Sequence, residues 1–179
     1  MPARLAAGLA GVAGDGAGAV CAAASAISSE SMTDLEVNED ALASRVAEEM
    51  LAAEGTGPAW GIVIEEARAG YARLRMTVRD DMLNGHRIVH GGMVFSLADT
   101  AFAYICNGKN ERTVAAQASI IFLDAAKEGE TLIAEGEEMS RVGRSGVTRV
   151  SVRAGDGRTI AEFTGYSRTI GGTIVETNS

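Results

Sequence analysis

The sequence contains only two cysteines and two histidines in 179 residues. Cys21 and Cys106 lie far apart and have no metal-ligand spacing, which argues against both a disulfide framework and a zinc site. This use of cysteine fits a reducing compartment, so we expect a cytoplasmic protein.

Positive charge, aromatic residues and long apolar runs are scarce as well. Lysine and arginine total 16 against 24 aspartates and glutamates, which gives a net charge of −8. Such a balance argues against nucleic acid as a partner, because phosphate binding requires a basic surface. No apolar run reaches the length of a membrane span, so we expect no membrane partner. Aromatic residues make up 4% of the chain, so the core must be largely aliphatic.

The first 31 residues differ from the rest in being rich in alanine, glycine and serine. A signal peptide is one interpretation, but several glycines and Asp15 interrupt its apolar stretch early. We instead predict a disordered leader, or translated sequence upstream of a true start at Met32. Residues 32–179 are then long enough for one domain with a substantial core.

Hydrophobic periodicity in this domain predicts one antiparallel sheet and two helices. Residues 39–54 form an amphipathic pattern, with Leu42, Val46, Met50 and Ala53 on one stripe. Residues 91–106 read as a second helix, preceded by a loop over 80–89. Strands are expected at 60–65, 71–78, 114–123, 131–137, 147–153 and 159–167, with Gly70 turning the first hairpin. The resulting fold class is α+β, with a sheet wrapped around one long helix.

The run GGMVFSLADTAFAYIC, residues 91–106, contains a single charged side chain, Asp99. A helix that is apolar on every side belongs in a core or between subunits. One curved sheet covers only part of such a helix, so we expect a homo-oligomer. A carboxylate in this setting is costly unless it is paired, hydrogen-bonded or used for chemistry.

The residues around the start of this helix suggest an oxyanion site. Gly91 and Gly92 begin the helix, where backbone N–H groups have no intrahelical acceptor and can stabilise a carbonyl oxygen. His90 can donate a hydrogen bond or hold the loop, and Asn84 can orient a water or a carbonyl. Asp99 lies about 12 Å further along the helix axis, too far to serve the same carbonyl. The conflict disappears if two such helices meet antiparallel across a dimer, so the spacing predicts a site shared between subunits.

Simpler interpretations of these residues remain open. Asp99 can be a structural carboxylate bonded to Ser96 or Thr100, or paired across the interface, and His90 can be a loop residue. Asn84 and Gly85 form a common turn dipeptide. His86 and His90 are four residues apart, but they lie in a loop without a third ligand, so we expect no metal.

The stretch MLNGHRIVHGGMVFSLADTAFAYICN strongly resembles the PaaI thioesterases of phenylacetate degradation, a family within the hotdog-fold superfamily. The likeness continues more loosely through ASIIFLDAAKEGETLIAE and GYSRTIGGTI. It implies a hotdog fold, in which an antiparallel sheet of five to six strands wraps around the central helix.

The same resemblance implies hydrolysis of acyl-CoA thioesters, notably ring-hydroxylated phenylacetyl-CoA, without cofactor or metal. Asp99 takes the place of the catalytic carboxylate, as nucleophile or general base. Gly91 matches the residue whose backbone N–H polarises the carbonyl from the other subunit, and His90 and Asn84 match supporting residues. Family analogy also favours a tetramer built from two dimers.

The anionic nucleotide of CoA makes strand-end arginines candidates for substrate binding. We single out Arg144, together with Thr100 beside the predicted catalytic carboxylate. Two departures from the family bear on the acyl group: Met93 and Val94 make the helix entry more apolar, and LDAAKEG lacks an Arg-Pro pair. The alternative functions are a hotdog acyl-CoA hydratase or dehydratase, and an acyl-CoA-binding regulator without turnover.

Overall fold

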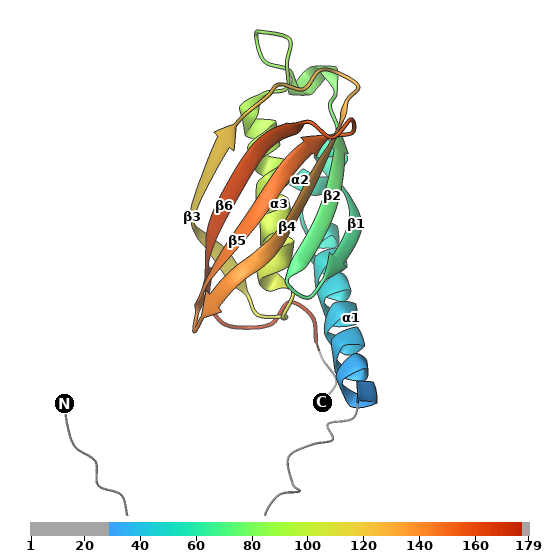
Figure 1. Cartoon of the computed structure of the whole chain (residues 1–179), viewed down its shortest axis with the longest axis vertical. Coiled ribbons are helices and arrows are strands. Elements are labelled where there is room, and N and C mark those ends of the chain that lie inside the picture. The colour runs from blue at the N-terminus through green and yellow to red at the C-terminus, as the bar shows by residue number, and fades with distance from the viewer. Residues whose placement is uncertain (1–28, 177–179) are drawn as a thin grey trace, which may run out of the picture.

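A single curved sheet encloses much of one central helix in the computed structural model, which describes residues 29–176 (Figure 1). The helices are α1 (Ser29–Ala53), α2 (Thr56–Trp60) and α3 (Gly91–Asn107), with a short 3₁₀ helix at Asp80–Met82. The strands are β1 (Val63–Arg68), β2 (Tyr71–Thr77), β3 (Thr113–Phe122), β4 (Thr131–Val142), β5 (Ser145–Ala154) and β6 (Thr159–Thr169). The prediction of an α+β fold with five to six strands is confirmed.

All strand pairings in the sheet are antiparallel, in the order β1-β2-β4-β5-β6-β3. The alternation predicted for β2 holds, since Ala72, Leu74 and Met76 are fully buried. Val150 and Val152 of β5 are likewise buried on this inner face, against α3. β1 and β3 form the two edges of the sheet in this chain.

α3 packs against every strand and against α1, yet one stripe of its surface is left open. The residues of this open stripe, partly or fully exposed, are Gly92, Phe95, Ser96, Asp99 and Ala103. They recur at the three- and four-residue spacing of one helix face. The expectation that one sheet covers only part of this helix is therefore correct for this chain. None of the helices within residues 29–176 is long and apolar enough to cross a membrane.

Several predicted boundaries were wrong. The strand expected at 60–65 begins only at Val63, because residues up to Trp60 form α2, whose last turn is closed by Gly61 in a left-handed conformation. The loop expected over 80–89 starts with a turn of 3₁₀ helix. The buried stripe of α1 includes Ala43 and Ala47, whereas Ala53 is exposed.

The N-terminal helix also extends further than the pattern suggested. α1 begins at Ser29 instead of Glu39, so the last three residues of the predicted leader belong to it. The remainder of that leader, residues 1–28, lies outside the described part of the chain.

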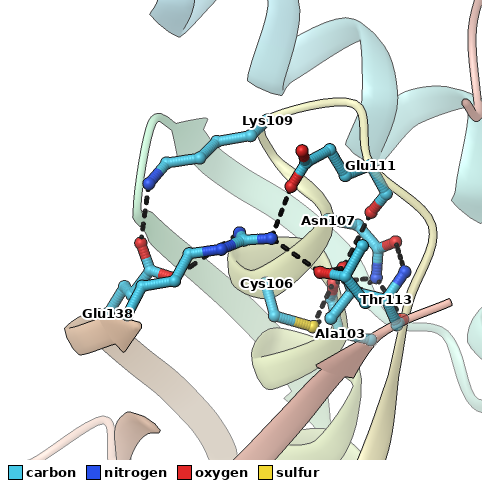
Figure 2. A network of polar contacts seen from close by, with 9 residues as sticks. Ala103, Cys106, Asn107, Lys109, Glu111, Thr113 and Glu138 are labelled. Carbon is cyan, nitrogen blue, oxygen red and sulfur yellow. Dashed lines mark hydrogen bonds and ion pairs between the residues drawn. The ribbon is translucent and has the colours of Figure 1, made fainter. Parts of the chain in front are cut away.

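The C-terminal end of α3 is fastened to the start of β3 by a polar network (Figure 2). The Asn107 amide donates to the carbonyl oxygens of Ala103 and Thr113, and it accepts from the Thr113 N–H, at 2.9 Å in each case. Beside it, Arg141 pairs with Glu111 and Glu138. These contacts fix how α3 is aligned with the edge strand.

Thr148 offers a test of packing on the inner face of the sheet. Its hydroxyl is fully buried and has no hydrogen-bond partner among the described residues. Burying an unpaired hydroxyl lowers the free energy of unfolding. We expect Thr148→Val, which keeps the shape, to raise the free energy of unfolding by about 1 kcal/mol and the melting temperature by about 2–4 °C. Calorimetry measures both.

The matched control is Thr113→Val, because the Thr113 hydroxyl contacts the Glu111 carbonyl and the Thr169 hydroxyl. That substitution should lower stability by a similar amount. A melting temperature that falls in both variants would contradict the conclusion that the buried Thr148 hydroxyl lacks a hydrogen-bond partner within residues 29–176.

Candidate active site

The loop before α3 is organised by Asn84. Its side-chain oxygen accepts from the N–H of His86 at 2.8 Å, and its own N–H donates to the Ile88 carbonyl at 2.9 Å. Arg87, between them, adopts a left-handed conformation with φ of 59°. The asparagine therefore holds a tight turn against the start of α3, while the imidazole of His86 is exposed.

His90 caps the N-terminus of α3. Its Nδ1 accepts a hydrogen bond from the Gly92 N–H at 2.9 Å, and its own N–H donates to the Met82 carbonyl at 2.8 Å. These two bonds set the direction in which the helix begins. The Gly91 N–H, one position earlier, has no acceptor in the part of the chain described here. It is the type of donor that stabilises an oxyanion at a helix N-terminus.

A cleft of about 350 Å³ opens beside Gly91. Its lining comes from the Asn84 loop, the first turn of α3 and the segment that follows β3. The residues are Asn84, Ile88, Val89, Gly91, Val94, Phe122, Leu123, Asp124 and Ala125. The walls are mostly apolar, so the Gly91 N–H and the Asn84 amide are among the few groups that can orient a ligand there.

Asp99 is half-buried on the open stripe of α3. Neither neighbouring hydroxyl binds it: Ser96 donates to the Gly92 carbonyl and Thr100 to the Ser96 carbonyl, both at 2.8 Å. The prediction that Asp99 bonds to Ser96 or Thr100 was therefore wrong, while its pairing across an interface stays a prediction. Within residues 29–176 the carboxylate forms no hydrogen bond or ion pair, and burial raises its pKa above the ordinary aspartate value.

The predicted site residues fall into separate groups in one chain. Asn84 and Gly91 line the cleft and His90 caps the helix next to them, whereas Asp99 is two turns further along α3. Thr100 is next to Asp99 but is buried, and its hydroxyl is used within the helix.

Arg144 lies at the far end of the sheet. It contacts the Thr169 carbonyl, and Thr169 pairs with Thr113, whereas Gly91 adjoins Phe122. The two ends of β3 are about 30 Å apart. A single chain therefore does not bring Arg144 to the cleft.

Neither a metal site nor nucleophilic catalysis by Cys106 finds support in the described residues. They contain no group of three or more His, Cys, Asp or Glu side chains that could hold a metal ion. Cys106 is buried, which raises the pKa of its thiol to about 12 and makes it a poor nucleophile.

Sequence reasoning missed the contribution of the segment after β3. Phe122 and Leu123 line the cleft although they lie about thirty positions after Gly91 in the sequence. The register β3–β6, with Phe122 opposite Ala161, carries this segment to the start of α3. Only the turn residues that follow in LDAAKEG hinted that the strand ends there.

The sequence is similar to those of known thioesterases. Residues 86–161 match the model of the Thioesterase superfamily. Acyl-coenzyme A thioesterase PaaI of Escherichia coli is 43% identical over 116 residues, covering 65% of this chain and 83% of that protein.

The fold is also similar to those of solved structures of this kind. That of the E. coli PaaI protein, from the phenylacetic acid degradation operon, has a TM-score of 0.74 and 39% identity, covering 75% of this chain and 97% of that one. A hypothetical thioesterase of Streptococcus pneumoniae, solved with coenzyme A, has a TM-score of 0.61 and 26% identity, covering 63% and 88%.

The chain therefore belongs to the thioesterase superfamily. Within it, the resemblance to the PaaI thioesterases is confirmed, and with it the hotdog fold and the prediction of a thioesterase enzyme.

The raised pKa of Asp99 predicts that this residue costs stability at neutral pH. The folded protein binds the Asp99 proton more tightly than the unfolded chain, so stability is lost as pH rises through the raised pKa. We expect Asp99→Asn to raise the melting temperature at neutral pH, with the difference shrinking in acid. Thermal denaturation across pH measures this.

Asp156→Asn is a suitable control, because Arg158 lowers the pKa of Asp156 and gives the opposite sign. If Asp99 were instead a stabilising structural residue, its replacement would lower the melting temperature at neutral pH.

Proposed function

We propose that this protein hydrolyses acyl-CoA thioesters at sites shared between two subunits. The observation that carries the proposal is the separation along one helix of two groups, the Gly91 N–H and the Asp99 carboxylate, that have no partner within residues 29–176. A hydrolase needs an oxyanion donor and a base or nucleophile at the same carbonyl. Two helices arranged antiparallel supply both from different chains.

The free edge of the sheet supports a dimer built in this way. No strand among residues 29–176 pairs with the outer side of β3, and an open, apolar edge is prone to pair with another chain. Val114 and Ile121 on this strand are 46% and 64% exposed. The open stripe of α3 adjoins the same edge and consists largely of small residues, which permit a close approach of a second helix.

Two-fold symmetry then defines the register. If Gly91 faces Asp99 of the partner subunit, Asp99 faces Gly91 of the partner subunit, and the axis passes near Phe95, midway between them. Antiparallel pairing of the two edge strands also brings the Thr113 end of one chain to the Phe122 end of the other. Arg144 then approaches the cleft of the partner subunit, where it is a candidate contact for the substrate's phosphates.

The chemistry requires no metal or cofactor. The Gly91 N–H polarises the thioester carbonyl, and the partner subunit's Asp99 either takes a proton from an attacking water or attacks the acyl carbon itself. In both routes the carbon–sulfur bond breaks, water supplies the hydroxyl of the acid product, and a proton goes to the CoA thiolate. His90 and Asn84 hold the loop that aims the Gly91 N–H.

The acyl group that we propose is an arylacetyl group, with ring-hydroxylated phenylacetyl-CoA as the leading candidate in phenylacetate catabolism. Support comes from the apolar cleft and from the relative that is named acyl-coenzyme A thioesterase PaaI. A tetramer of two such dimers is the assembly we propose by analogy with the family.

The first test is CoA release from a panel of aryl and aliphatic acyl-CoA thioesters. Asp99→Asn should lower kcat about a hundredfold or more, because an amide is neither base nor nucleophile. Wild-type kcat should fall as pH drops through the raised pKa of Asp99, so the acidic limb should lie above the ordinary aspartate range. Thioesters left intact at high enzyme concentration, with CoA still bound, would favour the regulator.

Subunit complementation tests whether the site is shared. Gly91→Pro removes the N–H while proline remains compatible with the first helical position. Neither this variant nor Asp99→Asn should be active alone. A mixed dimer, however, unites an intact Gly91 with an intact Asp99, so random mixing should restore about a quarter of wild-type activity. Coexpression with two tags provides the mixed dimers, and their inactivity would place the whole site within one chain.

A further inference from the structure

Phe122, the last residue of β3, lies directly against the start of α3. A Cβ placed on Gly91 would be 3.1 Å from Phe122 Cζ and 3.3 Å from Cε1. Contacts this short mean that a side chain at position 91 would have to push the Phe122 ring aside by a few tenths of an ångström. The phenyl ring and Gly91 therefore border the same cleft.

Backbone conformation does not explain why position 91 is a glycine. Gly91 is the first residue of α3 and is not among the residues with positive φ. Any amino acid can adopt its conformation, and alanine would favour the helix. The close approach of the Phe122 ring is the feature of the structure that disfavours a side chain at this position.

Phe122 is not a core residue in this chain. Its side chain is 52% exposed although it is large and apolar. The exposed part of the ring lines the cleft, with Val89, Val94 and Leu123 among the other apolar residues. A dry apolar cavity of about 150 Å³ is enough to bind benzene, so a cleft of about 350 Å³ has room for an aryl group.

We propose that Phe122 determines which acyl group the enzyme accepts, by forming the wall of the acyl pocket beside the Gly91 N–H. This inference rests on the proposed thioesterase site and adds a residue to it. An aryl ring entering the cleft meets the ring of Phe122, and offset or edge-to-face aromatic contacts are favourable beyond the area they bury. For a bulkier acyl group, the same ring is a steric obstacle to binding.

The test measures kcat/KM for phenylacetyl-CoA, hexanoyl-CoA and naphthylacetyl-CoA with wild type, Phe122→Leu and Phe122→Ala. Loss of the ring should lower kcat/KM for phenylacetyl-CoA by about ten- to a hundredfold, the range for an altered apolar contact. Hexanoyl-CoA should change less than threefold in Phe122→Leu, which keeps an apolar wall. Naphthylacetyl-CoA should improve in Phe122→Ala, which enlarges the cleft.

Tyr166→Ala is the matched control. Tyr166 is an exposed aromatic residue on the neighbouring strand β6, opposite Gln117 and far along the sheet from Phe122. It faces away from α3, so its loss should leave the substrate ranking unchanged. Size-exclusion chromatography of each variant separates a change in assembly from a change in specificity.

A double-mutant cycle tests the contact with Gly91 directly. Gly91→Ala keeps the N–H but introduces a methyl group that displaces the Phe122 ring. It should lower kcat/KM for phenylacetyl-CoA in the wild-type background and do so at least fivefold less in the Phe122→Ala background. A side chain that only supported the fold would produce no such coupling.

The outcomes separate this inference from the proposed function. Thioester hydrolysis with the same substrate ranking in all Phe122 variants would overturn the role of Phe122 and leave the thioesterase assignment intact. A wild-type protein that hydrolyses none of the thioesters would overturn both. A changed ranking together with coupling to position 91 would establish Phe122 as a specificity residue.

Discussion

The architecture depends on the burial of α3. A helix this apolar must be removed from water, and a curved sheet achieves this for most of its surface. The geometry of one layer leaves a stripe uncovered, and Asp99 lies on that stripe. The incomplete cover of α3, on which we base the proposed dimer, also leaves the Asp99 carboxylate half-buried. Within the described residues this carboxylate has no partner, in the setting that raises its pKa.

The two ends of α3 differ in how their backbone polar groups are hydrogen-bonded, and the candidate active site lies at the N-terminal end. At the C-terminal end, the side chain of Asn107 joins the helix to β3, and Arg141 stands beside it among acidic partners (Figure 2). At the N-terminal end, the cap satisfies the N–H of Gly92, whereas that of Gly91 has no acceptor within residues 29–176. The bonds of His90 to the Gly92 N–H and to the Met82 carbonyl fix the direction of the helix at this end.

Much of the fold was visible in the sequence because its pattern is local. Alternation in β2 and the unbroken apolar run of α3 follow directly from which faces are buried. The start of β1 was wrong because Trp60, apolar and next to a strand, instead ends a short helix closed by Gly61.

For the site, sequence spacing grouped Asn84, His90 and Gly91 correctly, since they lie in one loop and the first turn of a helix. Phe122 was missed because only the register of β3 against β6 brings it to Gly91. Strand pairing over that distance along the chain leaves no local signature. The prediction that Arg144 contacts the substrate is not met within one chain. The pairing of the strands places the turn between β4 and β5, which carries Arg144, at the end of the sheet opposite the cleft.

His90 is an unusual choice for a helix cap, a position that serine, threonine, aspartate and asparagine fill more often. Because its Nδ1 lone pair is occupied by the Gly92 N–H, the proton of the neutral ring resides on Nε2. The cap is thus locked in one tautomer, and the atom it turns toward solvent is a donor. Serine or aspartate would satisfy the helix equally well and would offer no such outward N–H at the entrance to α3.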